Sequence, residues 1–402
     1  MKVVVIGSGP AGLTAAIFAA KNNHQVTILE KNNQTGKKLL ITGNGKCNYF
    51  NSDMETSHYY SNNKELLTEI INEKNINEIL IFLESIGIFP NIKNGYFYPK
   101  SNKSKFVRDT MLEETILQNI KIEYNFEVLN ITKKDKFIIK SNDKEITADK
   151  IIIATGSKAY PNTGSDGKGY ELAEKIGHTI IKPFPSLVPL IGEGDYFNFW
   201  KGARTDAIVS LYENDKQIKQ EEGEVQFTDY GLSGICIFNL SSLITRNLEN
   251  KNEIHINFLP FLKTNDSGKV IDYLNNKSQI ITGRKLNLFL QTFIEEKLVQ
   301  TILKVTNIDE NKYFDELNKK EKYHLAQNLI SFKVKIIKTK GFDYSQVCSG
   351  GIPLNEINLK TMESKQQKNV YIIGELLDVN GDCGGYNLAF AFITGMLAGK
   401  GV

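Results

Sequence analysis

The sequence predicts an α/β fold built around a parallel β-sheet, and two observations predict it. The N-terminal residues follow the order strand, glycine turn, helix, strand, which is a βαβ unit. The C-terminal residues repeat strand, glycine turn and helix, so we expect both ends of the chain in one domain. The segments are residues 3–6, 7–12, 13–20 and 25–29 at the start, and residues 369–373, 374–387 and 388–398 at the end.

The first glycine turn has the composition of a dinucleotide site. Gly7 permits a tight turn, Gly9 lets the backbone approach a pyrophosphate, and Gly12 allows the helix to pack on the strand. The helix N-terminus offers unpaired N–H groups and a positive dipole to the phosphates. Glu30 follows the second strand, where a carboxylate accepts hydrogen bonds from the adenosine ribose and disfavours a 2′-phosphate. We therefore expect FAD or NAD rather than NADP.

Composition indicates a globular protein of two or three structural units. The chain has 402 residues, more than one hydrophobic core usually supports, and its net charge is only +3. No block of basic residues stands out, so nucleic acid is not expected as a partner. The chain enters its first strand at once, and no apolar stretch reaches the roughly 20 residues of a membrane span. We expect a cytoplasmic protein with no membrane partner.

The cysteines and histidines show no metal-ligand spacing. The four cysteines form no CxxC pair, and a structural disulfide is not expected in the cytoplasm. The five histidines are expected to be surface or capping residues rather than catalytic bases, and no metal is expected. These residues are Cys47, Cys236, Cys348 and Cys383, and His24, His58, His178, His255 and His324.

A glycine-rich loop is predicted at residues 36–51. Its glycines favour backbone amides that approach a ligand, and Lys37, Lys38 or Lys46 would neutralise phosphate charge. A flexible surface loop is the alternative, and the loop alone does not decide between them. The positions expected at the ligand are Thr42, Gly43, Gly45, Cys47 and Asn48.

Helices and short strands follow this loop. Apolar residues recur at helical spacing over residues 63–87 and 101–119, and the second helix is predicted to place Phe106 and Ile116 on its apolar face. Three short strands are then predicted to form a β-meander. They span residues 121–131, 136–140 and 145–148.

A buried-type strand over residues 150–153 leads into Ala154, Thr155 and Gly156. This resembles the Ala-Thr-Gly signature of two-dinucleotide flavoproteins, in which the chain passes close to the cofactor. The glycine-rich segment 160–170 lacks the Gly-x-Gly-x-x-Gly spacing, and no buried strand leads into it. We expect it to be a structured loop that caps the next helix.

The predicted secondary structure changes twice in the middle of the chain. Prolines near residue 186 indicate that the chain passes into another structural unit there. Predicted strands and turns follow, and amphipathic helices begin near residue 264. We therefore predict a discontinuous first domain, an inserted β-rich domain and a helical cap. Their bounds are 1–186 with 341–402, 187–263 with 332–340, and 264–331. The predicted strands are 207–213, 222–227, 235–240, 253–258 and 333–338, and the main predicted helices are 284–305 and 313–330.

The C-terminal turn sharpens the prediction from an adenine dinucleotide to FAD. Glu375, which follows Gly374 at the end of the strand, would meet the ribityl or pyrophosphate part of FAD. The amide groups of Gly385 to Leu388 would direct a helix dipole at one end of the flavin ring. Reduced flavin carries negative charge there, and a helix N-terminus stabilises it by roughly 1 kcal/mol.

Short motifs throughout the chain resemble one known family. They are similar to those of the BaiN-like, or aminoacetone-oxidase-like, family of FAD-dependent oxidoreductases, and the resemblance covers nearly the whole chain. It implies a discontinuous FAD-binding Rossmann domain of glutathione-reductase-like type, an inserted β-barrel-like domain and a small helical cap. The motifs are residues 36–39, 43–48, 223–228, 231–234, 361–365, 374–378 and 384–387.

The resemblance also implies cofactor contacts. Lys46 stands where many relatives have arginine. Lysine keeps the positive charge but lacks the planar guanidinium group, which puts a bidentate contact there in doubt. Asn44 stands where relatives often have glycine, and asparagine is tolerated there because it can adopt a left-handed backbone conformation. The contacts carried over by position are Ala11, Glu30, Lys31, Lys38, Leu39, the backbone of Val128, Glu375, Asn387 and Leu388. The motifs add Gly7, Gly9, Pro10, Gly12, Ala154, Thr155, Gly156, Gly374, Gly385 and Tyr386 to the loop positions given above.

These observations predict a FAD-dependent oxidoreductase of a small-molecule substrate. A single Gly-x-Gly-x-x-Gly fingerprint is present, so NADH or NADPH would bind only transiently. A reductase of a small unsaturated substrate, linked to NADH or NADPH, is favoured. A peroxide-forming amine oxidase and a non-catalytic or RNA-modifying flavin module are the alternatives. Tyr386 and Cys383 are the catalytic candidates nearest the ring, although packing on the ring and filling a small apolar space are the favoured roles.

Overall fold

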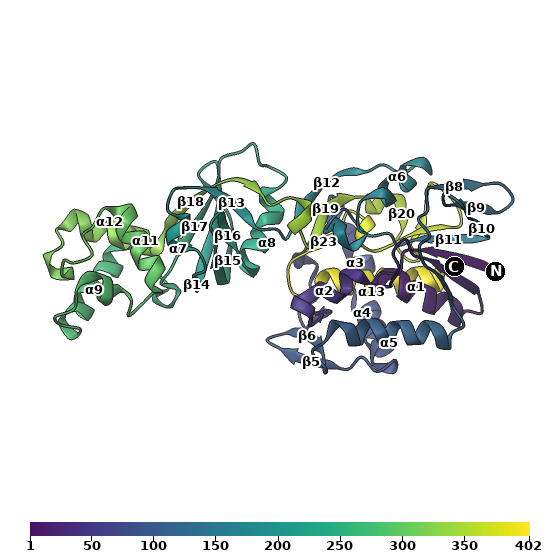
Figure 1. Ribbon diagram of the computed structural model, residues 1–402, viewed down its shortest axis with the longest axis horizontal. Coiled ribbons are helices and arrows are strands. Elements are labelled where there is room, and N and C mark those ends of the chain that lie inside the picture. The colour runs from purple at the N-terminus through teal and green to yellow at the C-terminus, as the bar shows by residue number, and fades with distance from the viewer. The chain divides into compact units, whose positions relative to one another are not determined.

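The computed structural model describes residues 1–402 and confirms the predicted α/β fold with a barrel and helices (Figure 1). The chain divides into two compact units. The first joins Met1–Ser186 to Phe342–Val402, and the second is Leu187–Gly341. The finer division of residues 187–341 into a β-rich domain and a helical cap stays a prediction.

A seven-stranded sheet forms the centre of the first unit. Its strands are β1 (Lys2–Ile6), β2 (Gln25–Leu29), β7 (Lys121–Glu123), β11 (Lys150–Ile153), β20 (Ile357–Asn358), β21 (Glu363–Ser364) and β22 (Val370–Ile372). Their spatial order is β20-β21-β22-β11-β1-β2-β7, and the pairs from β22 to β7 are parallel. Because β1 lies between β2 and β11, the turns that follow these three strands meet at the same edge of the sheet.

The first and last long helices of this unit pack directly on each other. These are α1 (Pro10–Lys21) and α13 (Tyr386–Gly401). A Cβ on Gly395 would lie 2.5 Å from the carbonyl oxygen of Ala11, and one on Gly399 would lie 2.5 Å from that of Ala15. The two glycines of α13 therefore allow a backbone approach that a larger residue would prevent, which joins the two ends of the chain.

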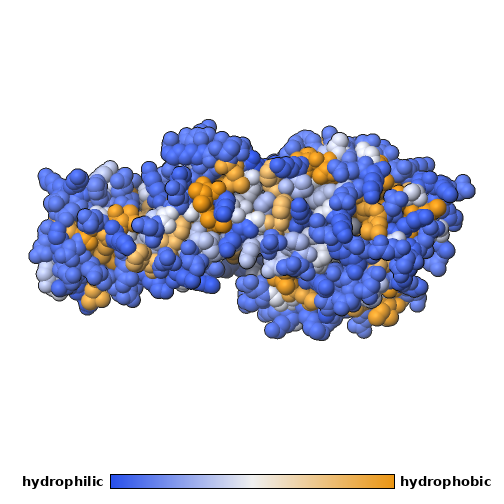
Figure 2. Space-filling view, turned by 45° about the horizontal axis from the view of Figure 1, so that its top comes forward, coloured by the Kyte–Doolittle hydropathy of each residue, from blue (hydrophilic) through white to orange (hydrophobic).

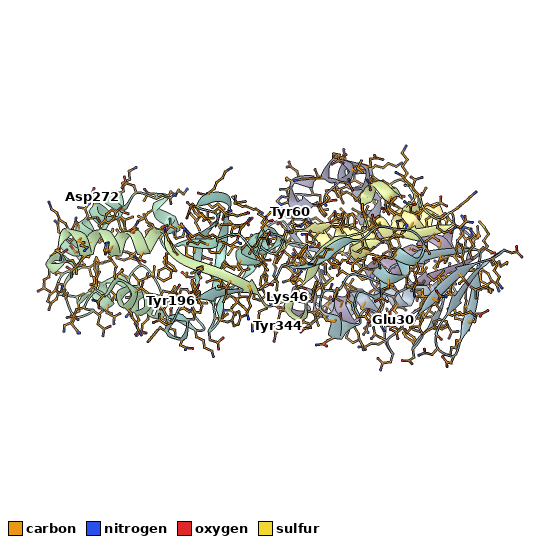
Figure 3. The ribbon with its side chains drawn as sticks, turned by 90° about the horizontal axis from the view of Figure 1, so that it is seen from above. Glu30, Lys46, Tyr60, Tyr196, Asp272 and Tyr344 are labelled. Atoms are coloured by element: carbon orange, nitrogen blue, oxygen red, sulfur yellow. The ribbon has the colours of Figure 1, made fainter.

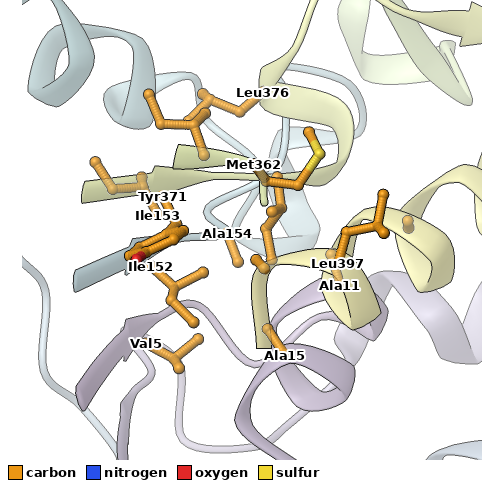
Figure 4. Packing of buried hydrophobic residues seen from close by; sticks show 14 of the residues in the cluster. Val5, Ala11, Ala15, Ile152, Ile153, Ala154, Met362, Tyr371, Leu376 and Leu397 are labelled. Carbon is orange, nitrogen blue, oxygen red and sulfur yellow. The ribbon is translucent and has the colours of Figure 1, made fainter. Parts of the chain in front are cut away.

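Hydrophobic side chains from sheet and helices form the core of the first unit (Figure 4). Val5 and Ile152 come from adjacent strands, and Ala15 and Leu397 come from α1 and α13. The β-branched runs are buried on both faces, as expected for parallel strands covered on each side. The Tyr371 hydroxyl, in the same cluster, donates a hydrogen bond to the carbonyl of Gly401 at 2.9 Å.

Smaller sheets and helices complete the first unit. The predicted strand over residues 121–131 is divided in two, because β7 joins the main sheet and the meander starts only at Asn130. The remaining strands are β3 (Phe50–Asn51), β4 (Tyr59–Tyr60), β5 (Pro90–Lys93), β6 (Tyr96–Pro99), β8 (Asn130–Lys133), β9 (Phe137–Lys140), β10 (Glu145–Ala148), β12 (Ile181–Ser186), β19 (Val347–Gly351) and β23 (Asn380–Gly381). The remaining helices are α2 (Lys37–Ile41), α3 (Leu67–Ile70), α4 (Glu73–Ser85), α5 (Ser104–Leu117) and α6 (Lys168–Lys175).

The helix predicted over residues 101–119 is α5, but its buried face differs from the predicted one. Val107 and Met111 are buried, whereas Phe106 and Ile116 are exposed. The prediction grouped all apolar residues on one face, and the helical repeat separates these four.

A closed six-stranded barrel forms the body of the second unit. Its strands are β13 (Leu190–Glu193), β14 (Arg204–Glu213), β15 (Lys216–Phe227), β16 (Gly231–Ser233), β17 (Asn252–Asn257) and β18 (Phe332–Thr339), in the spatial order β13-β16-β15-β14-β17-β18. All of its recorded strand pairs are antiparallel. Trp200 is buried in the hydrophobic cluster of this unit, and its ring nitrogen donates to the carbonyl of Thr228 at 3.0 Å.

The predicted strand over residues 235–240 is wrong, because this segment begins helix α8 (Ile235–Ile244). Its buried residues Cys236, Ile237, Leu240 and Ile244 follow helical spacing. The segment predicted as one helix over residues 284–305 forms two helices, α10 (Leu286–Leu290) and α11 (Glu296–Thr306). The helices of this unit besides α8 are α7 (Phe197–Trp200), α9 (Ser267–Ile280), α10 (Leu286–Leu290), α11 (Glu296–Thr306) and α12 (Lys319–Ile330).

On the face drawn in Figure 2, hydrophilic residues predominate and hydrophobic residues gather in small patches. None of the helices has the length and apolar character needed to cross a membrane.

Candidate functional site

The glycine turn after β1 leaves open space at one position only. Gly7 has φ +104°, and a Cβ there would lie 2.5 Å from the carbonyl oxygen of Ala154. A Cβ on Gly12 would lie 2.0 Å from the carbonyl oxygen of Gly7. A Cβ on Gly9, in contrast, would meet no atom within 4 Å. Gly7 and Gly12 therefore serve internal packing, whereas Gly9 keeps free the space that a pyrophosphate would need.

Helices α1 and α13 both begin without a side-chain cap, as α2, α3, α5 and α6 of this unit also do. The N-cap of α1 is Gly9, followed by Pro10, and the N-cap of α13 is Gly385 with φ +98°. Neither helix start has a side-chain hydrogen bond to its first N–H groups. Each start therefore presents N–H groups and the positive end of a helix dipole to an anionic or electron-rich ligand.

Glu30, labelled in Figure 3, lies directly after β2. It is buried, and both of its carboxylate oxygens accept hydrogen bonds. It accepts from the backbone N and Oγ of Ser8 at 3.0 and 2.5 Å, and from the backbone N and Nδ2 of Asn32 at 2.8 Å each. Four bonds match the roughly four acceptor positions of a carboxylate. Glu30 thus holds the glycine turn and the following loop together, and a ribose hydroxyl would have to share or replace one of these donors. Lys31 pairs with Asp166 at 2.8 Å.

Lys38 and Glu375 come together from distant parts of the sequence. The Lys38 Nζ lies 2.7 Å from Oε2 of Glu375, and the Ser157 hydroxyl donates to the same oxygen at 2.9 Å. The Tyr170 hydroxyl donates to the Glu375 carbonyl at 3.5 Å. Sequence reasoning missed Ser157, although it directly follows the Ala-Thr-Gly segment. Leu39, the neighbour of Lys38, is buried in the core.

The predicted loop over residues 36–51 is wrong in its first part, because residues 37–41 form helix α2. The backbone after α2 is left-handed at Gly43, Asn44, Gly45 and Cys47, and the φ of Asn44 is +53°. Asn44 thus adopts the conformation expected of it. Lys46, labelled in Figure 3, lies in this turn and is exposed.

A backbone hydrogen bond between Cys47 and Thr42 stabilises this turn. The Cys47 N–H donates to the Thr42 carbonyl at 3.0 Å, and the Thr42 hydroxyl donates to the Leu39 carbonyl at 2.7 Å. Burial raises the pKa of the Cys47 thiol to about 12, although a hydrogen bond with Thr42 opposes the shift. Cys47 is therefore a protonated, unreactive thiol at neutral pH. Asn48 follows, half-buried.

The Ala-Thr-Gly segment packs behind the glycine turn. Ala154 contacts the turn as described above, and the hydroxyl of Thr155 is buried without a hydrogen-bond partner. A Cβ on Gly169 would lie 1.8 Å from this hydroxyl, so Thr155 faces α6. Gly156 has φ +74°, and Gly374 lies so close to α1 that its Cβ would be 3.1 Å from that of Ala11. Val128 is buried in the core of the same unit.

The residues around the start of α13 bond mainly to the preceding loop. The Asn387 Nδ2 donates to the Gly381 carbonyl at 2.9 Å, and its Oδ1 accepts from the Gly381 N–H at 2.8 Å. Tyr386 is buried, and Leu388 and Cys383 are partly buried. Asn387 therefore orders the loop through its side chain.

The structure also brings a histidine to this helix start, which sequence reasoning missed. The His58 ring stacks on Tyr386 with a centroid distance of 4.7 Å, and its two nitrogens face Asp53 and Asp382. His58 was expected to be a surface or capping residue. Its partner Asp382 is 324 positions away in the sequence, so no local pattern indicates the contact.

Comparison with known proteins gives the family. The model of the HI0933-like protein Rossmann domain matches residues 1–401. The chain belongs to the HI0933-like family. Two relatives align with the chain over nearly their full length. A 3-dehydro-bile acid delta(4,6)-reductase of Clostridium scindens is 35% identical over 405 residues, which cover 99% of this chain and 98% of that protein. A ribosomal RNA dihydrouridine synthase of Escherichia coli is 25% identical over 397 residues, which cover 97% and 94%.

A solved structure shares the fold of this HI0933-like chain. It is the open conformation of a flavocytochrome c3 fumarate reductase, with a TM-score of 0.51 and 15% identity, and the match covers 100% of this chain and 77% of that chain. The family confirms the BaiN-like resemblance, and the chain is a FAD-dependent oxidoreductase with FAD as its cofactor. The open space at Gly9 and the free N–H groups at the starts of α1 and α13 fit this cofactor.

Proposed function

We propose that this chain is an NAD(P)H-dependent reductase that saturates a carbon–carbon double bond in a small organic substrate. The observation that carries the proposal is the alignment over 99% of the chain with a protein named as a delta(4,6)-reductase. FAD supplies hydride transfer when it is bound. The protein supplies binding, orientation and protons.

The pyrophosphate of FAD is assigned to the start of α1. Gly9 leaves the space for it, and the uncapped N–H groups of α1 stabilise its charge. Glu30, held by Ser8 and Asn32, is positioned for the adenosine ribose. Lys38 and Glu375 are assigned to the middle of the cofactor, where the lysine offsets the carboxylate charge.

The flavin ring is assigned to the start of α13. Its N–H groups would stabilise the negative charge of reduced flavin by roughly 1 kcal/mol. Gly385 makes this start possible, because φ is +98° and a Cβ would lie 2.4 Å from the Phe50 carbonyl oxygen. The remaining cofactor contacts predicted from the sequence are proposed here as well.

The electron donor is assigned to NADH or NADPH, bound transiently. The sequence holds a single glycine-triplet fingerprint, which the FAD assignment already uses. Anaerobic stopped-flow mixing of the yellow protein with NADH, NADPH or small amines tests this. Bleaching by a reduced nicotinamide is expected. Failure of both nicotinamides, with bleaching by an amine and peroxide formation on re-aeration, would show an amine oxidase instead.

A second candidate is reduction of a pyrimidine base in RNA. It is favoured by the relatives named ribosomal RNA dihydrouridine synthases in Escherichia coli and Haemophilus influenzae, at 25% and 26% identity. The near balance of 49 basic and 46 acidic residues argues for the small-molecule substrate instead. Filter binding of ribosomal RNA at physiological salt separates the two. Retention of RNA there, with nicotinamide-dependent dihydrouridine formation, would favour the RNA substrate.

A further inference from the structure

His58 holds both ring nitrogens against carboxylates. Its Nδ1 lies 3.3 Å from Oδ2 of Asp382, and its Nε2 lies 2.9 Å from Oδ2 of Asp53. An imidazolium ring can donate both hydrogen bonds at once, whereas a neutral ring can donate only one. With Tyr60 and Tyr386, these residues form a polar group, the His58 cluster.

The backbone fixes the geometry of the His58 cluster. β4 pairs with β23, and Gly381 lies opposite Tyr59. The Asp382 N–H then donates to the His58 carbonyl at 2.9 Å, and the Tyr60 hydroxyl donates to Oδ1 of Asp382 at 3.0 Å. Strand pairing therefore sets the distance between the imidazole and the inner carboxylate.

Exposure decreases along the cluster from one carboxylate to the other. The exposed fractions of the side chains are 56% for Asp53, 31% for His58 and 8% for Asp382. The imidazole thus lies between a solvent-facing carboxylate and a buried one. A proton lost from His58 can be replaced from water through Asp53, while Asp382 orients the ring.

The cluster also reaches the helix start to which the flavin ring is assigned. The His58 and Tyr386 rings stack at 4.7 Å with an interplanar angle of 19°, and Tyr386 is the first residue of α13. The Tyr59 hydroxyl donates to the Tyr386 carbonyl at 3.1 Å, which ties β4 to the same helix start. A side chain that can carry a proton therefore lies beside this end of α13.

We propose that His58 donates the proton that completes reduction of the substrate double bond. The inference rests on the proposed function, in which a hydride passes with its electron pair from FAD, reduced by NADH or NADPH, to one carbon. The π electron pair forms a C–H bond at the other carbon with a ring proton of His58. The broken N–H bond leaves its electron pair on the ring nitrogen, and water restores the proton through Asp53.

The stacking of the two rings and the raised pKa of Tyr386 favour His58 over Tyr386 as the acid. Burial, followed by the nearby Asp53, Asp382 and Tyr96, raises the pKa of Tyr386. Its hydroxyl is therefore a poorer acid than an ordinary phenol, and its ring is covered on one side by the imidazole. Tyr386 is thereby left with a packing role against the His58 ring, and its predicted packing on the flavin ring stays a prediction.

The test compares His58→Gln with His324→Gln, a matched change at an exposed histidine of α12. The reduced holoenzyme is mixed anaerobically with 2-cyclohexen-1-one or with ferricyanide, which accepts electrons without forming a C–H bond. We expect His58→Gln to slow reoxidation by the enone about 100-fold or more. FAD content, reduction by nicotinamide and reoxidation by ferricyanide should match the control.

Rescue by imidazole separates proton donation from a structural role. Imidazole added to His58→Ala should restore part of the enone rate, which it would not do for a residue that only supports the fold. Nitrogen NMR signals of the His58 ring should move in Asp382→Asn and Asp53→Asn, which checks the two ring contacts independently of activity. Equal enone rates in the wild type and His58→Gln would overturn the proton donor alone. A wild type that an amine reduces and that no enone reoxidises would overturn the proposed function, and the donor with it.

Discussion

Lys38 and Glu375 form an ion pair of 2.7 Å across 337 positions of the sequence. The pair joins the segment after β2 to the segment after β22, and Ser157, which follows β11, donates to the same carboxylate oxygen at 2.9 Å. Three segments that each follow a parallel strand therefore converge on one carboxylate. This convergence gives the cofactor assignment its firmest geometric support within the first unit.

Replacing Lys38 with Met should weaken both the fold and FAD retention. Glu375 is about one-fifth exposed, so its charge would lose its main partner in a largely desolvated position. We expect a loss of about 1–3 kcal/mol in the free energy of unfolding and a lower FAD-to-protein ratio. Glu375→Gln, which keeps hydrogen-bonding capacity without the charge, should cost less. Equal stability of Lys38→Met and the wild type would contradict the prediction. Urea unfolding and absorbance of bound flavin measure the two effects.

Glycines of the first turn should respond to substitution in opposite ways. Gly9→Leu adds a side chain at a position where a Cβ meets no atom within 4 Å, so we expect a folded but colourless protein, destabilised by no more than about 1 kcal/mol. Gly7→Ala forces a Cβ to 2.5 Å from the Ala154 carbonyl oxygen at φ +104°, so we expect about 1–3 kcal/mol of destabilisation. Flavin absorbance and thermal unfolding distinguish them. A yellow Gly9→Leu protein would contradict the pyrophosphate placement.

The sequence predicted those parts of the fold that depend on the residue pattern of a single segment. The β-branched run at residues 3–6 and the glycine spacing after it needed no distant partner to be interpreted. Residues 235–240 gave a wrong strand because a short apolar run fits a buried strand and a buried helix equally well. The serines and buried apolar residues that continue it to Ile244 were the available sign of a helix.

The candidate site was predictable only where a residue belongs to a motif. Glu30 follows a strand at the expected distance from the glycines, whereas Ser8 and Asn32, which fix its carboxylate, carry no pattern of their own. His58 and Asp382 are 324 positions apart, and their contact depends on the pairing of two short strands. The pairing of two such distant strands belongs to the tertiary structure, and the local pattern of either strand does not specify it.

Enlarging Gly399 should separate the two helices that join the chain ends. Its Cβ would lie 2.5 Å from the Ala15 carbonyl oxygen and 2.6 Å from the Phe18 Cβ. We expect Gly399→Val to destabilise the first unit by about 1–3 kcal/mol, because overpacking forces the backbones apart. Gly283→Val, at a glycine with no atom within 4 Å but φ +68°, serves as a backbone control in the second unit. Hydrogen exchange resolves the two units, and unchanged protection of α1 would contradict this prediction.

The stability of the first unit should fall below neutral pH because of His178. Burial lowers the pKa of His178 below its ordinary 6.5, and this outweighs the opposing hydrogen bond with Glu356. Its Nδ1 lies 2.7 Å from Oε2 of Glu356, and its Nε2 lies 2.7 Å from the Ser364 hydroxyl. Below about pH 6.5 the unfolded chain takes up a proton that the folded protein does not, so stability is complete above that pH and is lost as pH falls.

Urea unfolding at pH 7.5 and pH 5.5 measures the contribution of His178. Burial alone would raise the pKa of Glu356, but hydrogen bonds from Thr179 and His178 lower it below its ordinary 4.5, so Glu356 stays ionised over this range. His178→Gln should therefore reduce stability at pH 7.5, since one partner is lost, and should shrink the difference between the two pH values. The exposed His324→Gln should leave that difference unchanged. A difference of the same size in His178→Gln would assign the pH dependence to another group.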